Sequence, residues 1–169
     1  MEVVIMIILL SILLFTAVLF FLLFLLILIH EFAHAIHFLK HGVKPDKIEI
    51  GIGPVVCQKN WKGTPVFFKV IPLEGEVDCS VSTLSTVNAV ERCRNVINAQ
   101  IATALTSTLF FAVAGVILAV FHAENIIAAM LLCSFIVAGM AGYVSALFNF
   151  LPISVDGANF WHYARRLRR

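Results

Sequence analysis

The apolar and polar positions divide the chain into three long apolar stretches and one polar insert. The apolar stretches run from about residue 3 to 39, from about 99 to 121 and from about 126 to 150. Each exceeds the roughly 18–20 residues that a helix needs to cross a bilayer. We therefore predict three transmembrane helices, the first capped by Gly42 and the third ended by Pro152.

The polar insert between the first and second helices has a different pattern. Residues 47–50 alternate between polar and apolar, and residues 59–63 are a turn signal between two apolar runs. Such patterns are typical of strands joined by a turn. We predict a small β-element at the membrane surface over about 47–77. We read residues 74–85 as irregular and residues 87–98 as an amphipathic helix leading into the second span.

Composition agrees with a membrane protein. Hydrophobic residues make up 61% of the 169 residues, whereas soluble domains are nearer half apolar. The predicted fold class is a membrane all-α protein with one β-element between helices 1 and 2, in a single domain over residues 1–169. The first apolar stretch lacks a basic start and is too long for a signal peptide, so we expect a permanent span.

The basic residues are confined to two regions. All 12 Lys and Arg lie between residues 40 and 94 or in a basic tail at 162–169. The positive-inside rule then predicts a multi-pass protein with its N-terminus outside and its β-element and C-terminus in the cytoplasm, most simply in a bacterial plasma membrane. We read the tail as a contact to the lipid bilayer and not to nucleic acid.

The cysteines lack the spacing of a metal site. No Cys-x-x-Cys pair occurs, and three of the four fall in the region assigned to the reducing cytoplasm. We therefore expect neither disulfides nor a cysteine zinc site from Cys57, Cys79, Cys93 and Cys133.

An HExxH motif ends the first span. His30 and His34 are four residues apart and share one face of a helix, so they can hold one Zn²⁺ ion. Glu31 lies beside the first of them and is placed to act as general base toward the attacking water. A charge within a membrane helix costs at least ~3 kcal/mol, so Glu31 needs a role or a partner. An accidental match to the motif is the alternative.

A catalytic zinc site needs a third protein ligand, and Asp156 is the best candidate. It follows the helix break at Pro152, on the same side of the membrane as the HExxH motif. Local sequence leaves a second interpretation open, in which Asp156 is a helix N-cap followed by Gly157 as a turn residue.

The remaining histidines have weaker claims to a metal. His37 and His41 extend the stripe of His30 and His34, and we interpret them as partly hydrated interfacial side chains. His122 lies toward the opposite face and His162 beyond the break, so we expect neither to be a ligand.

Taken together, these motifs resemble the site-2 protease family of intramembrane zinc metalloproteases. After HExxH, the chain has a Gly-x-Gly-Pro turn at residues 51–54 and a Pro-Leu-x-Gly run at residues 72–75. A third-helix signature follows, with Asn149, Pro152 and Asp156-Gly157. The resemblance covers nearly the whole chain in order.

The resemblance implies a set of roles. His30, His34 and Asp156 would hold one zinc ion per chain, with Glu31 as the catalytic base. Asn149 would position the substrate or stabilise the oxyanion. A β-loop over residues 48–77 would guide a transmembrane protein substrate, which is cleaved within or next to its membrane segment.

Two departures from the family pattern leave the choice of substrate open. The second helix lacks the Gly-Pro-x-x-Asn motif of many members, and the equivalent stretch is residues 104–110. The 169 residues have no room for the PDZ or CBS domain that many members carry. Selection would then rest on the core itself, on prior trimming of the substrate, or on a regulatory membrane partner or a second copy of the chain.

Two other functions fit parts of the pattern. One is a catalytically silent homologue that binds membrane partners, although such chains usually lose a ligand or the base. The other is a metal transporter with membrane histidines, although the second helix offers mostly Ser and Thr as polar residues. Replacing Glu31 separates a protease from a binding protein.

Overall fold

The computed structural model describes residues 2–80, 87–121 and 126–167. Within them lie helix α1 (Glu2–Lys40), strands β1 (Lys47–Trp61) and β2 (Thr64–Asp78), and helices α3 (Ala89–Phe121), α4 (Ile126–Phe148) and α5 (Val155–Arg166). Helices α1, α3 and α4 are long and apolar enough to cross a membrane, and the two strands form an antiparallel sheet between α1 and α3. The predicted fold class is confirmed.

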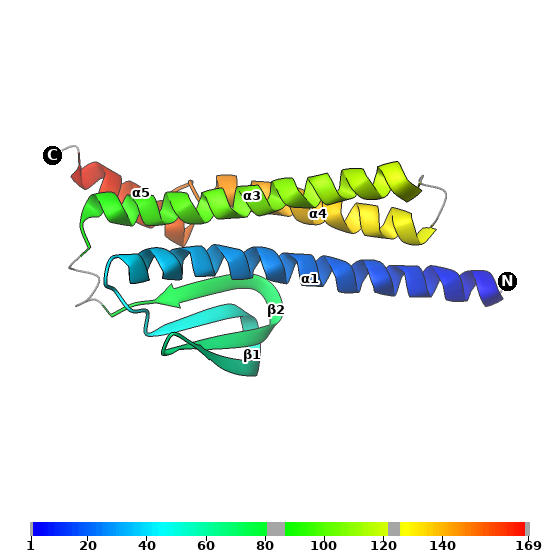
Figure 1. The fold of residues 1–169 in the computed structure, drawn as a ribbon, viewed down its shortest axis with the longest axis horizontal. Helices are drawn as coiled ribbons and strands as arrows, with labels where there is room; N and C mark the ends of the chain where they lie inside the picture. Colours follow the sequence, from blue (N-terminus) through cyan, green and yellow to red (C-terminus); the bar gives the residue numbers. More distant parts are fainter. Residues whose placement is uncertain (1, 81–86, 122–125, 168–169) are drawn as a thin grey trace.

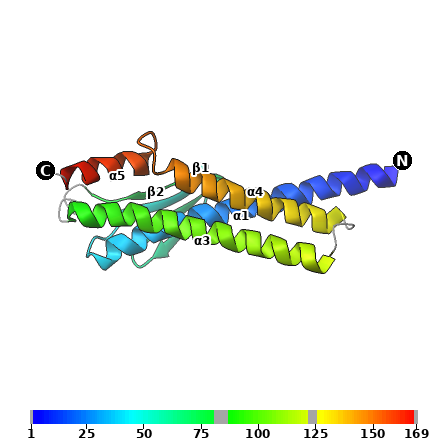
Figure 2. The same ribbon diagram turned by 90° about the horizontal axis from the view of Figure 1, so that it is seen from above.

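The three long helices lie side by side, and the strands cover one end of this bundle. Helices α3 and α4 run alongside α1, while the β-hairpin packs against the C-terminal half of α1 (Figures 1 and 2). Helix α5 lies at that same end, and the N-terminus of α1 lies at the other. The C-terminal end of α1, the start of α3 and the start of α5 are therefore brought together.

Small residues allow α4 to approach its neighbours closely. A Cβ on Gly142 would overlap the Ser107 hydroxyl of α3, and a Cβ on Gly139 would lie 3.0 Å from the Phe111 ring. Ala138, next to Gly139, has no exposed surface. Membrane helices pack through such small side chains because lipid supplies no hydrophobic force between helices.

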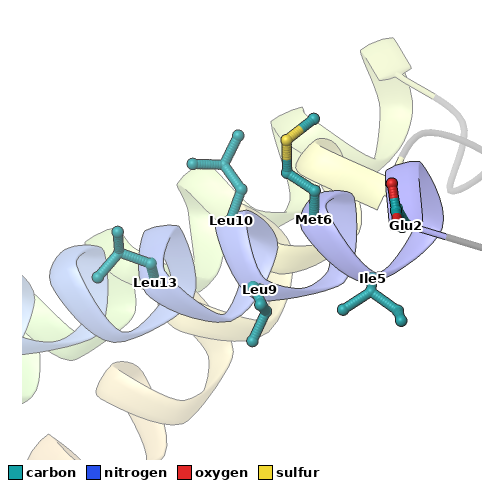
Figure 3. Close-up of a pocket in the computed structure, with 6 residues that line it drawn as sticks. All are labelled: Glu2, Ile5, Met6, Leu9, Leu10 and Leu13. Carbon is teal, nitrogen blue, oxygen red and sulfur yellow. The ribbon is translucent and has the colours of Figure 1, made fainter.

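The N-terminal part of α1 presents an apolar surface. Figure 3 shows a shallow hollow there, with Glu2 as its only charged side chain. Leu9, Leu10 and Leu13 are each more than 60% exposed. Ile5 and Met6 complete the lining of the hollow. In a helix of this length and composition, such an apolar surface suits contact with lipid.

The hairpin folds back on itself. Ile48 of β1 pairs with Val66 on one side and with Val77 on the other, so the first part of β1 lies between the two halves of β2. Ile48 and Ile50 are fully buried against α1, as their alternation with polar residues predicts. Positive φ at Lys62 and Gly63 makes the tight turn between the strands, a two-residue pattern that suits a twisted hairpin.

One sequence prediction needs correction here. Residues 74–78 are not irregular: they lie within β2, and residues 75–78 pair with β1. The predicted amphipathic helix does lead into the second span, and the two form one continuous helix, α3. The predicted outer turn at 122–125 and residues 81–85 of the predicted irregular segment lie outside the described residues.

The first helix ends as the sequence predicts. Gly42 has a φ of +76°, a conformation that glycine adopts without strain. The Val43 N–H donates to Phe38 O at 3.0 Å and so satisfies one of the last carbonyls of α1. This capping arrangement turns the chain toward the hairpin.

Candidate metal centre

Three side chains from two distant parts of the chain converge at the buried end of the bundle. His30 Nε2, His34 Nε2 and Asp156 Oδ2 form a triangle whose three sides are each 3.2 Å. Ligand atoms around a tetrahedral zinc ion lie about 3.3 Å apart, given metal–ligand distances of roughly 2.0–2.1 Å. The geometry of the three donors therefore fits zinc.

The outer nitrogen of each histidine is held by α3. Thr103 donates its hydroxyl proton to Ala99 O at 3.0 Å, so it accepts from His30 Nδ1, also at 3.0 Å. His34 Nδ1 meets the side-chain oxygen of Asn95. Both rings thus carry their proton on Nδ1 and turn the Nε2 lone pair inward, which is the tautomer that a metal requires.

The third donor is also oriented from α3. Gln100 donates its side-chain N–H to Asp156 Oδ2 at 3.0 Å. Three acceptor atoms that face one another at this distance repel unless a cation or a proton lies among them. The donor set therefore suits a divalent metal.

The start of α5 sets the position of Asp156. Ser154 is the N-cap of this helix, since its hydroxyl accepts from Gly157 N at 2.9 Å. Asp156 is thus in the first turn and is not the cap, which removes the second interpretation of its sequence. A Cβ on Gly157 would overlap the Leu151 carbonyl oxygen, so only glycine allows the chain to turn this tightly after α4.

Contacts between α5 and its neighbours hold this turn in place. The Arg92 side chain of α3 bonds to the Tyr163 hydroxyl and lies 4.7 Å from the centre of that ring. Trp161 Nε1 donates to Phe150 O at 2.8 Å. These contacts fix α5 relative to α3 and to the end of α4, and they keep Asp156 beside the histidines.

Glu31 lies against the backbone of β2. Its side chain is buried, and a Cβ on Gly75 would come within 2.7 Å of Glu31 Cδ. Only glycine fits at that position without moving the carboxylate. The hairpin therefore places the candidate base as well as covering it.

A cavity opens onto all of these groups. It measures about 890 Å³ and is lined by the two histidines, Glu31, Asp156 and Asn149. One wall is the last part of β2, residues 72–77, and the opposite wall is the end of α4 and the start of α5. The structure thus brings together every side chain that the sequence singled out for the site, and it leaves His162 exposed and apart.

The interpretation of His37 is wrong. This ring is buried against α3, where its Nε2 lies 2.9 Å from Glu91 O and its Nδ1 lies 3.0 Å from Asn98 Nδ2. Partial hydration was expected because local sequence does not show that the start of α3 covers this face of α1. His41 is about one-third exposed and lies 3.0 Å from Glu91 Oε2.

Sequence reasoning missed the residues that orient the donors. Asn95, Gln100 and Thr103 are each buried, in a stretch that the sequence predicts only as an amphipathic helix followed by a membrane span. One signal was available: buried polar side chains in an apolar helix need partners. That signal could have identified the helix face, although not the individual pairs.

Comparison with known proteins agrees with this geometry. A model of Peptidase family M50 matches residues 18–121, which include the HExxH motif, the hairpin and α3. A search of the curated proteins found no match. With well over half of its residues matched, and with its motifs at the bottom of one cavity, the chain belongs to peptidase family M50, the site-2 protease family of membrane metalloproteases.

Proposed function

We propose that this chain is an intramembrane zinc metalloprotease that hydrolyses peptide bonds within or next to the transmembrane segments of membrane-anchored proteins. The observation that carries the proposal is the triangle of His30 Nε2, His34 Nε2 and Asp156 Oδ2 beside a buried Glu31. It lies on a helix long and apolar enough to cross a membrane.

Each residue has a role in this proposal. His30, His34 and Asp156 hold the zinc ion, which supplies a Lewis acid that activates water and polarises the scissile carbonyl. Glu31 takes the proton from the attacking water and passes it to the leaving amine. Asn149 lines the same cavity, and its amide can donate to the oxyanion or hold the substrate backbone.

The cavity walls suggest how the substrate is held. Among the described residues, residues 75–78 of β2 pair only with β1, along one edge, so the other edge can accept an added strand. A transmembrane segment that unwinds locally can pair with this edge and become extended. The scissile bond would then pass between β2 and the end of α4, over the zinc site.

The experiment compares wild type with Glu31→Gln in a cleavage assay in detergent or liposomes, with a panel of single-span substrates. Bound zinc is measured in parallel. Loss of cleavage with zinc retained supports the protease and the role of Glu31. Glu2→Gln, at the far end of the same helix, is the matched control and should cleave as wild type does.

The other outcomes point elsewhere. If zinc binds but wild type cleaves no substrate in the panel, a catalytically silent homologue is favoured. If wild type binds no zinc, the site assignment is wrong. A strong chelator should abolish cleavage by wild type, and added zinc should restore it.

A further inference from the structure

A second cluster of metal-binding side chains lies outside the proposed catalytic cavity. His37 and His41 of α1 meet Glu91, in the first turn of α3, and their donor atoms all lie within 4.8 Å of one another. None of these three residues lines the cavity of the first site. They continue the stripe of His30 and His34, about 10 Å farther along the helix at a rise of roughly 1.5 Å per residue.

The spacing of the donor atoms fits a metal. Glu91 Oε2 lies 3.0 Å from His41 Nε2 and 3.6 Å from His37 Nε2. These values bracket the separation of about 3.3 Å expected between ligands of a tetrahedral zinc ion. His41 is partly exposed, so water can complete the coordination.

The surrounding hydrogen bonds prepare these donors. His41 Nδ1 lies 2.9 Å from His37 O and must donate to it, which leaves Nε2 to face the carboxylate. His37 Nε2 donates to Glu91 O at 2.9 Å, and Asn98 Nδ2 lies 3.0 Å from His37 Nδ1. When the Asn98 amide is turned, its oxygen can accept from Nδ1 instead, so that Nε2 can exchange its proton for the ion. Arg94 Nη1 donates to Glu91 Oε1 at 2.6 Å, so that oxygen is occupied and Oε2 is left for the histidines.

We propose that His37, His41 and Glu91 form a second binding site for zinc or a similar divalent transition ion. Two imidazoles and a carboxylate are typical ligands of such ions. The ion would join the last turn of α1 to the first turn of α3. Asn95, which holds His34, is one helical turn beyond Glu91, so the second ion would stabilise the interface from which the first site is oriented.

The test measures zinc per chain in the full-length protein, stripped with a chelator, reloaded with Zn²⁺ and freed of excess ion. Wild type should hold two equivalents and Glu91→Gln one. Glu91→His should again hold two, because it restores a zinc ligand although it removes the contact with Arg94. His162→Asn, which removes an exposed histidine outside both clusters, should leave two.

A double variant, His30→Asn with His34→Asn, separates this proposal from the catalytic one. The double variant should keep one equivalent of zinc, and the triple variant that also carries Glu91→Gln should keep none. Asn98→Ala should weaken the second zinc by about 10–100-fold, the usual effect of losing an outer partner of a ligand. If wild type holds one equivalent of zinc and the double variant holds none, the proposal is overturned. The cluster would then be only an ion pair of Glu91 with His41 and Arg94. Equal zinc content in Glu91→Gln and wild type would overturn the proposal too.

Discussion

At the scale of the residue, each donor of the proposed zinc site is oriented by one side chain of α3. Asn95 holds His34, Gln100 holds Asp156 and Thr103 holds His30. Hydrogen bonds from the outer nitrogens of the two histidines set their tautomer and direction and raise their basicity, and the Gln100 N–H holds the ligating oxygen of Asp156. The affinity of the site for zinc therefore depends on a helix that supplies no ligand.

Thr103 gives the clearest test of this dependence. Thr103→Val keeps the shape of the side chain but cannot accept from His30 Nδ1, so zinc affinity should fall by about 10–100-fold. Competition with a chromogenic chelator measures the change. Thr103→Ser keeps the hydroxyl and should bind as wild type does; equal affinities for valine and serine would show that the contact does not orient His30.

Gly75 tests the position of Glu31. Gly75→Ala places a methyl group within 2.7 Å of Glu31 Cδ, so either the strand or the carboxylate must move. We expect kcat to fall by about tenfold or more, the order of effect that misplacing a catalytic group produces, with zinc content unchanged. Gly115→Ala, where nothing lies within 4 Å of the added group, is the control and should retain activity. Unchanged kcat in Gly75→Ala would mean that the strand does not place the base.

At the scale of the element, an ion pair links the two strands of the hairpin. Lys69 of β2 donates to Glu49 of β1 at 2.5 Å, and Lys47 donates to the same carboxyl at 3.2 Å. The hydrogen bond from Lys69 lowers the pKa of Glu49 from its usual value, with Lys47 adding to the effect and burial opposing it.

This shift predicts how hairpin stability depends on pH. A carboxyl with a lowered pKa in the folded state stabilises that state above its unfolded pKa, about 4.5 here, and the stabilisation is lost as pH falls through the lower folded value. Amide protection in residues 47–50, taken relative to the intrinsic exchange rate at each pH, should therefore fall below about pH 4.5 more in wild type than in Glu49→Gln. The variant should have the faster exchange near neutral pH, and parallel pH profiles for the two proteins would contradict this role of Glu49.

The elements differ in how far local sequence predicts them. The long helices follow from apolar runs that only a membrane accommodates, and the hairpin turn follows from its glycine. The end of β2 falls within the predicted β-element, but local sequence also fits an irregular segment there, because residues 75–78 owe their strand to pairing with β1 rather than to an alternating pattern. For α5, local sequence indicates only a helix break, a candidate helix start near Asp156 and a basic tail, because the position of this helix depends on the contacts of Arg92 and Trp161.

At the scale of the whole molecule, the basic residues predict its orientation. The hairpin, the start of α3 and helix α5 all lie at one end of the bundle (Figure 1). These elements hold most of the Lys and Arg residues. The positive-inside rule then predicts that this end, with the proposed catalytic site, faces the cytoplasm. Reversal of the bundle would put the same charges outside.

Labelling of single cysteines tests the orientation. Cys57 is exposed on the hairpin, and with the other three cysteines replaced by serine it should react with an impermeant maleimide only after cells are permeabilised. In the cysteine-free background, the Glu2→Cys variant should react in intact cells. Labelling of Cys57 in intact cells would reverse the assignment.

The proposed catalytic motif and third ligand could be chosen from sequence because the chemistry of such a site limits it to few residue types and fixed spacings. HExxH requires a helix face, and Asp156 is an acidic residue just after a helix break on the same side of the membrane. The partners Asn95, Gln100 and Thr103 have no such spacing rule. Their roles depend on how α3 is turned against α1, which only the folded structure shows.

The distances between those three partners have a consequence for how the chain can vary in length. A helix turns by about 100° per residue, so deleting or inserting one residue between Asn95 and Thr103 would rotate one partner away from its ligand while leaving the other in place. Substitutions on the lipid-facing side of this interval leave the alignment intact. The number of residues between Asn95 and Thr103 is therefore fixed by the site, whereas the exposed positions between them can vary.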